Sequence, residues 1–93
     1  MINKNILNIR IKLDKLDNAF LKLIKKRTFL VDAVIKNKKF KKDIVDKKRI
    51  FKILKRINTK SKKNNIDPKI TKKIWTAMIR AYIDYEFRNF KKK

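Results

Sequence analysis

Three cationic residues interrupt an otherwise apolar helical pattern in the first part of the chain. Between residues 10 and 38, apolar side chains recur at alternating spacings of three and four, which is typical of a helix with one buried face. Arg10, Arg27 and Lys38 fall where that face calls for apolar side chains. Because a buried cation needs a partner, either this face is partly open to water or an anion binds against it.

The spacing of these cations limits what a single ligand can touch. Arg27 and Lys38 are 11 residues apart, so they project from nearly the same side of a helix, roughly 16 Å apart along its axis. Arg10 lies roughly 25 Å from Arg27 along the axis and about 100° around it. An antiparallel second copy would bring Arg10 of the partner subunit toward Arg27, which gives two shared sites per dimer. The alternative is that the cations lie at the edge of the apolar face and extend into water.

Two further pairs combine charge with helical spacing. Asp46 and Arg49 are three residues apart, and Tyr82 and Glu86 are four apart, so each pair shares one face of a helix. Glu86 is the only glutamate in the chain. Each pair has two interpretations: an ordinary surface contact of little energetic weight, or part of the lining of a polar pocket.

The composition predicts an all-helical single domain over residues 1–93. The 93 residues include no Gly, one Pro, no Cys and no His, and tight turns and sheets usually need Gly. The absence of His and Cys excludes His-based triads, thiolate chemistry and the usual zinc sites. A chain this short buries a thin core, so we expect partner chains to complete it.

Three helices are expected, and their limits follow from capping residues. The first runs from a cap at Asn3 or Asn5 to Lys38 or Lys39, too long to fold back on its own chain, so it should pair with a second copy. A polar loop over 39–48 leads to a second helix, from about Asp46 to Lys63, ended by Asn64-Asn65. Asp67 caps a third helix that starts at Pro68 and runs to about Phe90. The expected apolar faces are Ile50, Ile53, Leu54 and Ile57 on the second helix, and Ile70, Ile74, Trp75, Met78, Ala81, Tyr82 and Tyr85 on the third.

The net charge of +22 has two explanations. Of the 30 basic residues, 24 are Lys and six are Arg, and the Lys residues are spread along the whole chain. This spread favours a codon-driven excess of surface Lys over a dedicated nucleic-acid surface, although a basic nucleic-acid-binding protein stays an alternative. No apolar run reaches the ~18 residues of a membrane span. The N-terminus lacks the apolar region of a signal peptide, so we expect a cytoplasmic protein.

The order of these residues resembles a known family. The pattern R-x-x-[IL]-D-x-[IL]-D-x-x-[LF]-[LI]-x-L-[LI]-x-x-R is met from Arg10 through Arg27, and Lys38 follows at the expected distance. Next come D-x-x-R at Asp46–Arg49, then Ile66-Asp67-Pro68 before a final helix that ends in a polar pair. This set is similar to the all-helical, class II chorismate mutases over residues 5 to 90.

The resemblance implies a fold, a reaction and a set of roles. It implies an intertwined homodimer of three-helix chains that converts chorismate to prephenate in phenylalanine and tyrosine biosynthesis, without a cofactor or metal. The reaction is an intramolecular rearrangement, so it needs no protein nucleophile. Within that family pattern, Arg27 and Arg10 of the partner subunit would bind the substrate carboxylates, Lys38 and Glu86 would hold the ether oxygen, and Asp46, Arg49 and Tyr82 would line the pocket.

Two positions depart from the commonest family pattern. Ile50 stands where many members have a Glu that binds the substrate hydroxyl, and an apolar residue there also occurs in the related isochorismate pyruvate lyases, which are the second interpretation. Glu86 stands where many members have Gln. A carboxyl must carry a proton to donate to the ether oxygen, so we expect activity to fall as the pH rises. A helical coiled-coil scaffold, with the cations specifying its seam, is a further alternative.

Overall fold

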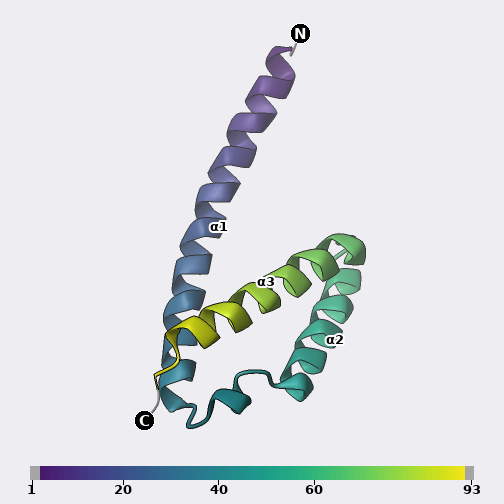
Figure 1. The fold of residues 1–93 in the computed structure, drawn as a ribbon. Helices are drawn as coiled ribbons and strands as arrows, with labels where there is room; N and C mark the ends of the chain where they lie inside the picture. The colour runs from purple at the N-terminus through teal and green to yellow at the C-terminus, as the bar shows by residue number, and fades with distance from the viewer. Residues whose placement is uncertain (1–2, 92–93) are drawn as a thin grey trace. The chain divides into compact units, whose positions relative to one another are not determined.

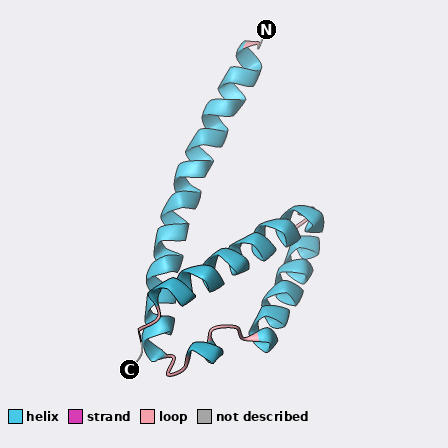
Figure 2. Cartoon of the chain, viewed as in Figure 1, coloured by secondary structure: helices cyan, strands magenta, loops and turns pink. Residues whose placement is uncertain are grey.

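The computed structural model describes residues 3–91, and all of its regular structure is helical (Figures 1 and 2). Three α-helices, α1 (Lys4–Asn37), α2 (Lys47–Lys63) and α3 (Pro68–Asn89), follow one another, with a short 3₁₀-helix, η1 (Lys41–Asp43), between α1 and α2. No strand occurs within residues 3–91. The predicted all-α, three-helix fold is therefore confirmed.

The helix ends follow the predicted capping residues closely. Asn3 Oδ1 accepts a hydrogen bond from the Ile6 N–H at 2.9 Å, so Asn3 caps α1. Asp46 Oδ1 accepts from the Arg49 N–H at 3.0 Å, and Asp67 Oδ1 accepts from the Lys69 N–H at 2.9 Å, with Pro68 at the first position of α3. The first helix ends at Asn37, so Lys38 lies just beyond it.

The connection between α2 and α3 is a Schellman turn built on asparagine. Asn65 has a φ of 57°, the left-handed conformation that asparagine tolerates better than most residues. The Ile66 N–H donates to the Ser61 carbonyl at 2.8 Å, and the Asn65 N–H donates to the Lys62 carbonyl at 3.3 Å. These bonds satisfy the last carbonyls of α2 and return the chain, so that α2 and α3 pack side by side as a hairpin (Figure 2).

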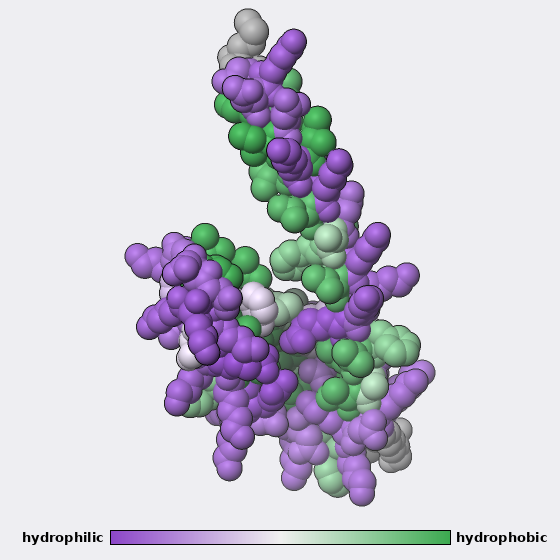
Figure 3. All heavy atoms as spheres, turned by 180° about the vertical axis from the view of Figure 1, so that it is seen from behind, coloured by the Kyte–Doolittle hydropathy of each residue, from purple (hydrophilic) through white to green (hydrophobic). Residues whose placement is uncertain are grey.

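The chain divides into two units at the boundary between Asp32 and Ala33. The N-terminal unit is the first part of α1, and most of its large apolar side chains are exposed. Phe29 is 75% exposed, and the others with substantial exposure are Ile6, Leu7, Ile9, Ile11, Leu13, Leu16, Phe20, Leu21, Leu23, Ile24 and Leu30. Figure 3 shows one face of the molecule, on which green, hydrophobic side chains lie among purple, hydrophilic ones along the helix. A helix that exposes so much apolar surface is typical of an interface with another chain.

The second unit, from Ala33 onward, holds the buried residues. Its apolar core consists of Ile35, Ile44 and Ile53. The expected face of α2 is confirmed, because Ile53 is buried and Ile50, Leu54 and Ile57 are partly buried. The expected face of α3 is wrong at Ile70, Ile74 and Ala81, which are exposed, and Thr71 is buried instead.

A hydrogen bond explains why a polar residue is buried at that position. Ser61 and Thr71 lie in the hairpin with their hydroxyl oxygens 2.7 Å apart, and the Ser61 hydroxyl also donates to the Ile57 carbonyl at 2.6 Å. Thr71, and not its neighbour Ile70, therefore faces α2. Because the buried hydroxyls satisfy each other, the hairpin tolerates them in place of apolar contacts.

Candidate functional site

A lysine and a glutamate far apart in sequence meet within the second unit. Lys38 follows the last residue of α1, and Glu86 lies near the end of α3. The Lys38 Nζ atom donates to Glu86 Oε1 at 3.3 Å, and the two side chains are 20% and 11% exposed. Since an ammonium only donates, this bond occupies one carboxylate oxygen and leaves Oε2 for another group.

A main-chain carbonyl completes the surroundings of the same ammonium. Lys38 Nζ also donates to the carbonyl oxygen of Ile44, again at 3.3 Å. Ile44 directly follows the 3₁₀-helix η1, in the segment that the sequence predicts to be a plain loop. Sequence reasoning does not identify this acceptor, because every residue carries a carbonyl and nothing in the residue type marks the one that is used.

The Asp46–Arg49 pair has a local structural role. The Asp46 carboxylate accepts from the main-chain N–H of Arg49 and so starts α2. Both side chains are exposed. Arg49 therefore lies in the first turn of a helix whose start is fixed by the carboxylate of Asp46.

Tyr82 lies one helical turn before Glu86 on α3. Its side chain is partly buried, and its ring meets that of Tyr85 edge to face, with centroids 6.3 Å apart and planes at 83°. The helical repeat places the phenol and the carboxyl of Glu86 on one face of α3. The predicted residues that lie after Ala33 are thus carried by the end of α1, the start of α2 and the end of α3.

The two predicted arginines of the first unit lie on α1. Arg10 is exposed, whereas Arg27 is partly buried and its Nε atom is fully shielded from solvent. A partly buried guanidinium in a helix rich in exposed apolar side chains is unusual, because arginine normally extends to water.

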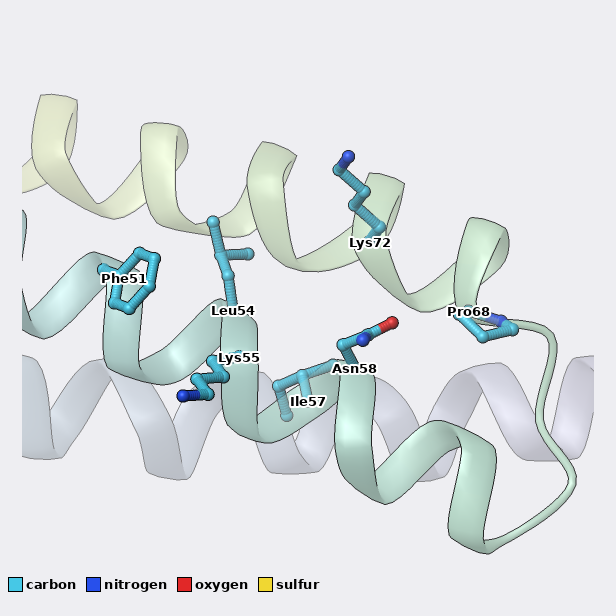
Figure 4. A pocket seen from close by; sticks show the side chains of 7 residues that line it. All are labelled: Phe51, Leu54, Lys55, Ile57, Asn58, Pro68 and Lys72. Carbon is cyan, nitrogen blue, oxygen red and sulfur yellow. The ribbon is translucent and has the colours of Figure 1, made fainter.

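A groove on the α2–α3 hairpin lies apart from these residues. It has a volume of about 550 Å³ and is lined mostly by apolar side chains, namely Phe51, Leu54, Lys55, Ile57, Asn58, Pro68 and Lys72 (Figure 4). Figure 4 shows Leu54 directed from α2 toward α3. None of the predicted site residues lines this groove. Its walls offer no carboxylate or paired cation, so it lacks the charge pairing seen at Lys38.

The Lys38–Glu86 pair combines a fixed positive charge with a carboxyl group at low exposure. Such a pair can bind an oxygen atom on which negative charge develops, because the ammonium stabilises the charge and a protonated carboxyl donates a hydrogen bond. Arginine side chains can bind carboxylates through their planar forks. Of the predicted arginines, Arg49 belongs to the same unit as the pair, whereas Arg10 and Arg27 belong to the first unit.

Comparison with known proteins points the same way. The family model described as chorismate mutase type II matches residues 9–87, which is most of the chain. Neither the curated proteins nor the solved structures contain a match to this chain. Arg10, Arg27, Lys38, Asp46, Arg49, Tyr82 and Glu86 all fall inside the matched range.

Proposed function

This chain belongs to the chorismate mutase type II family, and from that premise we propose that it catalyses the [3,3] rearrangement of chorismate to prephenate for phenylalanine and tyrosine biosynthesis. The observation that carries the proposal is the contact between Lys38 and Glu86 at 3.3 Å. These are the two residues that the family pattern assigns to the ether oxygen of the substrate, and they come from positions 48 residues apart.

The proposed mechanism needs geometry and charge, and no covalent chemistry by the protein. The substrate is held in a chair-like conformer, so its reacting carbons are already close to each other. As the ether bond breaks, negative charge grows on the ether oxygen. The Lys38 ammonium stabilises that charge. Glu86, which faces Lys38 as the carboxylate of an ion pair, donates a hydrogen bond to the same atom only in molecules whose Oε2 carries a proton.

The remaining roles concern the two carboxylates of the substrate and the walls of the pocket. Arg27 and Arg10 of the partner subunit bind the carboxylates, since an arginine fork accepts a carboxylate through two parallel hydrogen bonds. Arg49, presented by the cap at Asp46, adds positive charge from the start of α2. Tyr82 contacts a substrate carboxylate through its hydroxyl. In this proposal, residues 1–93 act together as one catalytic domain.

We further propose that the active form is an intertwined homodimer. The exposed apolar side chains of α1 support this, because a monomer would leave an apolar face of about nine turns in water. An antiparallel pair of α1 helices buries that face in an isologous interface, in which each copy gives the same residues to its partner. Each of the two active sites then contains Arg27 from one copy and Arg10 from the other.

A direct assay tests the activity. Purified protein is incubated with chorismate or with isochorismate, and the loss of substrate absorbance and the release of pyruvate are followed. Prephenate formation from chorismate supports the proposal, and Arg27→Ala should lower kcat/KM by at least about 100-fold. Pyruvate release from isochorismate without mutase turnover would instead assign the chain to the lyase reaction, and full activity of Arg27→Ala would remove the proposed site.

Mixed dimers test whether the site is shared. Arg10→Ala and Arg27→Ala, each inactive alone, are unfolded together and refolded as a mixture. If the site is shared, half of the dimers are mixed and each has one intact site, so about a quarter of wild-type activity returns. If Arg10 acts on its own chain, every site keeps one defect and the mixture stays inactive.

A further inference from the structure

The ammonium of Lys38 has a second anchor besides Glu86. Its two acceptors, Glu86 Oε1 and the Ile44 carbonyl oxygen, each lie 3.3 Å from Nζ. An ammonium has three donors at fixed angles. When two of them are engaged, rotation about the last side-chain bond is restricted, and with it the direction of the third N–H.

Ile44 is well suited to hold its carbonyl in place. Its side chain is 3% exposed, the lowest value among the buried apolar residues of the described chain. Its N–H donates to the Lys41 carbonyl at 3.2 Å, and its φ and ψ of −64° and −44° continue the 3₁₀ turn. Because the side chain is buried and the turn is hydrogen-bonded, the carbonyl that follows cannot rotate freely.

We propose that Ile44 is a positioning residue for Lys38: its buried side chain fixes the carbonyl that, together with Glu86, aims the ammonium. The inference rests on the proposed function, in which the third N–H of Lys38 addresses the ether oxygen. With Glu86 as the sole acceptor, the ammonium would turn about a single ion pair. The carbonyl is uncharged, so it orients the ammonium without neutralising the charge that the reaction needs.

This role differs from ordinary packing in what it predicts. A misaimed ammonium weakens an interaction made in the transition state, so kcat falls and KM changes little. Loss of packing alone lowers the thermal midpoint and leaves the kinetics of the folded fraction unchanged. Ile53 is the matched control, because it is the same residue type, is 8% exposed and lies on α2 outside the proposed site.

The experiment compares Ile44→Ala with Ile53→Ala in the full chain, at a temperature where circular dichroism shows both to be folded. We expect kcat to fall by about tenfold in Ile44→Ala, with KM within about twofold, and to stay within about twofold of wild type in Ile53→Ala. Ile44→Val, which keeps a branched side chain, should retain most of the rate. Equal kcat for the two alanine variants would overturn the inference.

A spectroscopic measurement separates this inference from the proposed activity. In protein labelled with ¹⁵N at lysine, the Lys38 Nζ resonance, assigned by its loss in Lys38→Met, should shift in Ile44→Ala and stay in place in Ile53→Ala. Should Ile44→Ala not fold, the same comparison is made with Ile44→Val, for which a smaller shift is expected. A chain without mutase turnover would contradict the proposed function, while an Nζ resonance indifferent to residue 44 would contradict the positioning role alone.

Discussion

Removing the charge of Lys38 should separate its contribution to stability from its contribution to catalysis. Lys38→Met keeps a flexible apolar stem of similar length but removes the cation that lies 3.3 Å from Glu86. Glu86→Gln keeps a polar group at the same place without a charge. The two single variants and the double variant form a thermodynamic cycle in which stability and rate should respond differently.

The stability effect follows from the distance and the burial of the pair. At 3.3 Å and an effective dielectric constant of about 20, the attraction between the two charges is about 5 kcal/mol, but most of it offsets the loss of hydration. Lys38→Met leaves a carboxylate that is only 11% exposed without its cation, which costs about 1–3 kcal/mol. The double variant buries no charge at this position, so it should regain most of that loss.

The lost catalytic rate, in contrast to the stability, should not be regained in the double variant. Without the ammonium, nothing at this position stabilises the charge on the ether oxygen, so we expect kcat to fall by about 10²–10³-fold in Lys38→Met and in the double variant. In Glu86→Gln alone, kcat should fall much less, because the amide still donates a hydrogen bond. Lys38→Arg is the matched control that keeps the charge but changes its shape, and its kcat should lie between those of Lys38→Met and Glu86→Gln.

Two measurements decide the outcome. Urea unfolding at a fixed protomer concentration reports stability, and the concentration must be fixed because association contributes to it. The loss of chorismate absorbance reports the rate. The reasoning is refuted if Lys38→Met keeps kcat within about threefold of wild type, or if the double variant recovers rate together with stability.

Two further predictions concern the hairpin and the charge of the whole chain. Thr71→Val should lower the free energy of unfolding by about 1 kcal/mol, a shift of about 5 °C in the thermal midpoint, because it leaves the buried Ser61 hydroxyl with one partner fewer. Thr71→Ser keeps the hydroxyl and should recover much of this loss. Neither variant should change kcat. An unchanged midpoint in Thr71→Val would show that the hydroxyl pair contributes nothing. The net charge of +22 should attract a dianionic substrate to the protein, so kcat/KM should fall several-fold between low salt and about 0.5 M salt while kcat stays constant. A kcat/KM that does not change with salt would show that the net charge does not speed association with the substrate.

The capping residues show how much of the fold can be predicted from sequence. Asp46, Asp67 and Pro68 act within four residues of their own positions, so their residue types alone locate the starts of α2 and α3. Asn65 locates the turn for the same reason, since few residues adopt a positive φ readily. Local chemistry of this kind needs no knowledge of the rest of the chain.

Contacts between distant elements could not be predicted in the same way. Hydropathy placed Ile70 and Ile74 in the core, but both are exposed, and Thr71 is buried between α3 and α2, where its hydroxyl forms a hydrogen bond with that of Ser61. The contact between Lys38 and Glu86 was expected only through the order of residues in the family pattern, because spacing says nothing about groups 48 residues apart. Nothing in the sequence indicated that the Ile44 carbonyl accepts a hydrogen bond from Lys38.

The arginines of this chain show why residue type alone does not mark a functional site. Arg88 is retained among many lysines, as Arg27 is, yet its guanidinium pairs with Asp84 at 3.1 Å on the outside of α3, where the two side chains are 64% and 72% exposed. Such a surface pair contributes little to stability. The distinction therefore comes from surroundings: the Nε of Arg27 is shielded from solvent, and Lys38 is held by two oxygens from separate elements. A cation held at low exposure by more than one contact has lost the freedom that water gives a surface charge, and that loss is the physical reason for proposing Lys38, and not Arg88, as a catalytic residue.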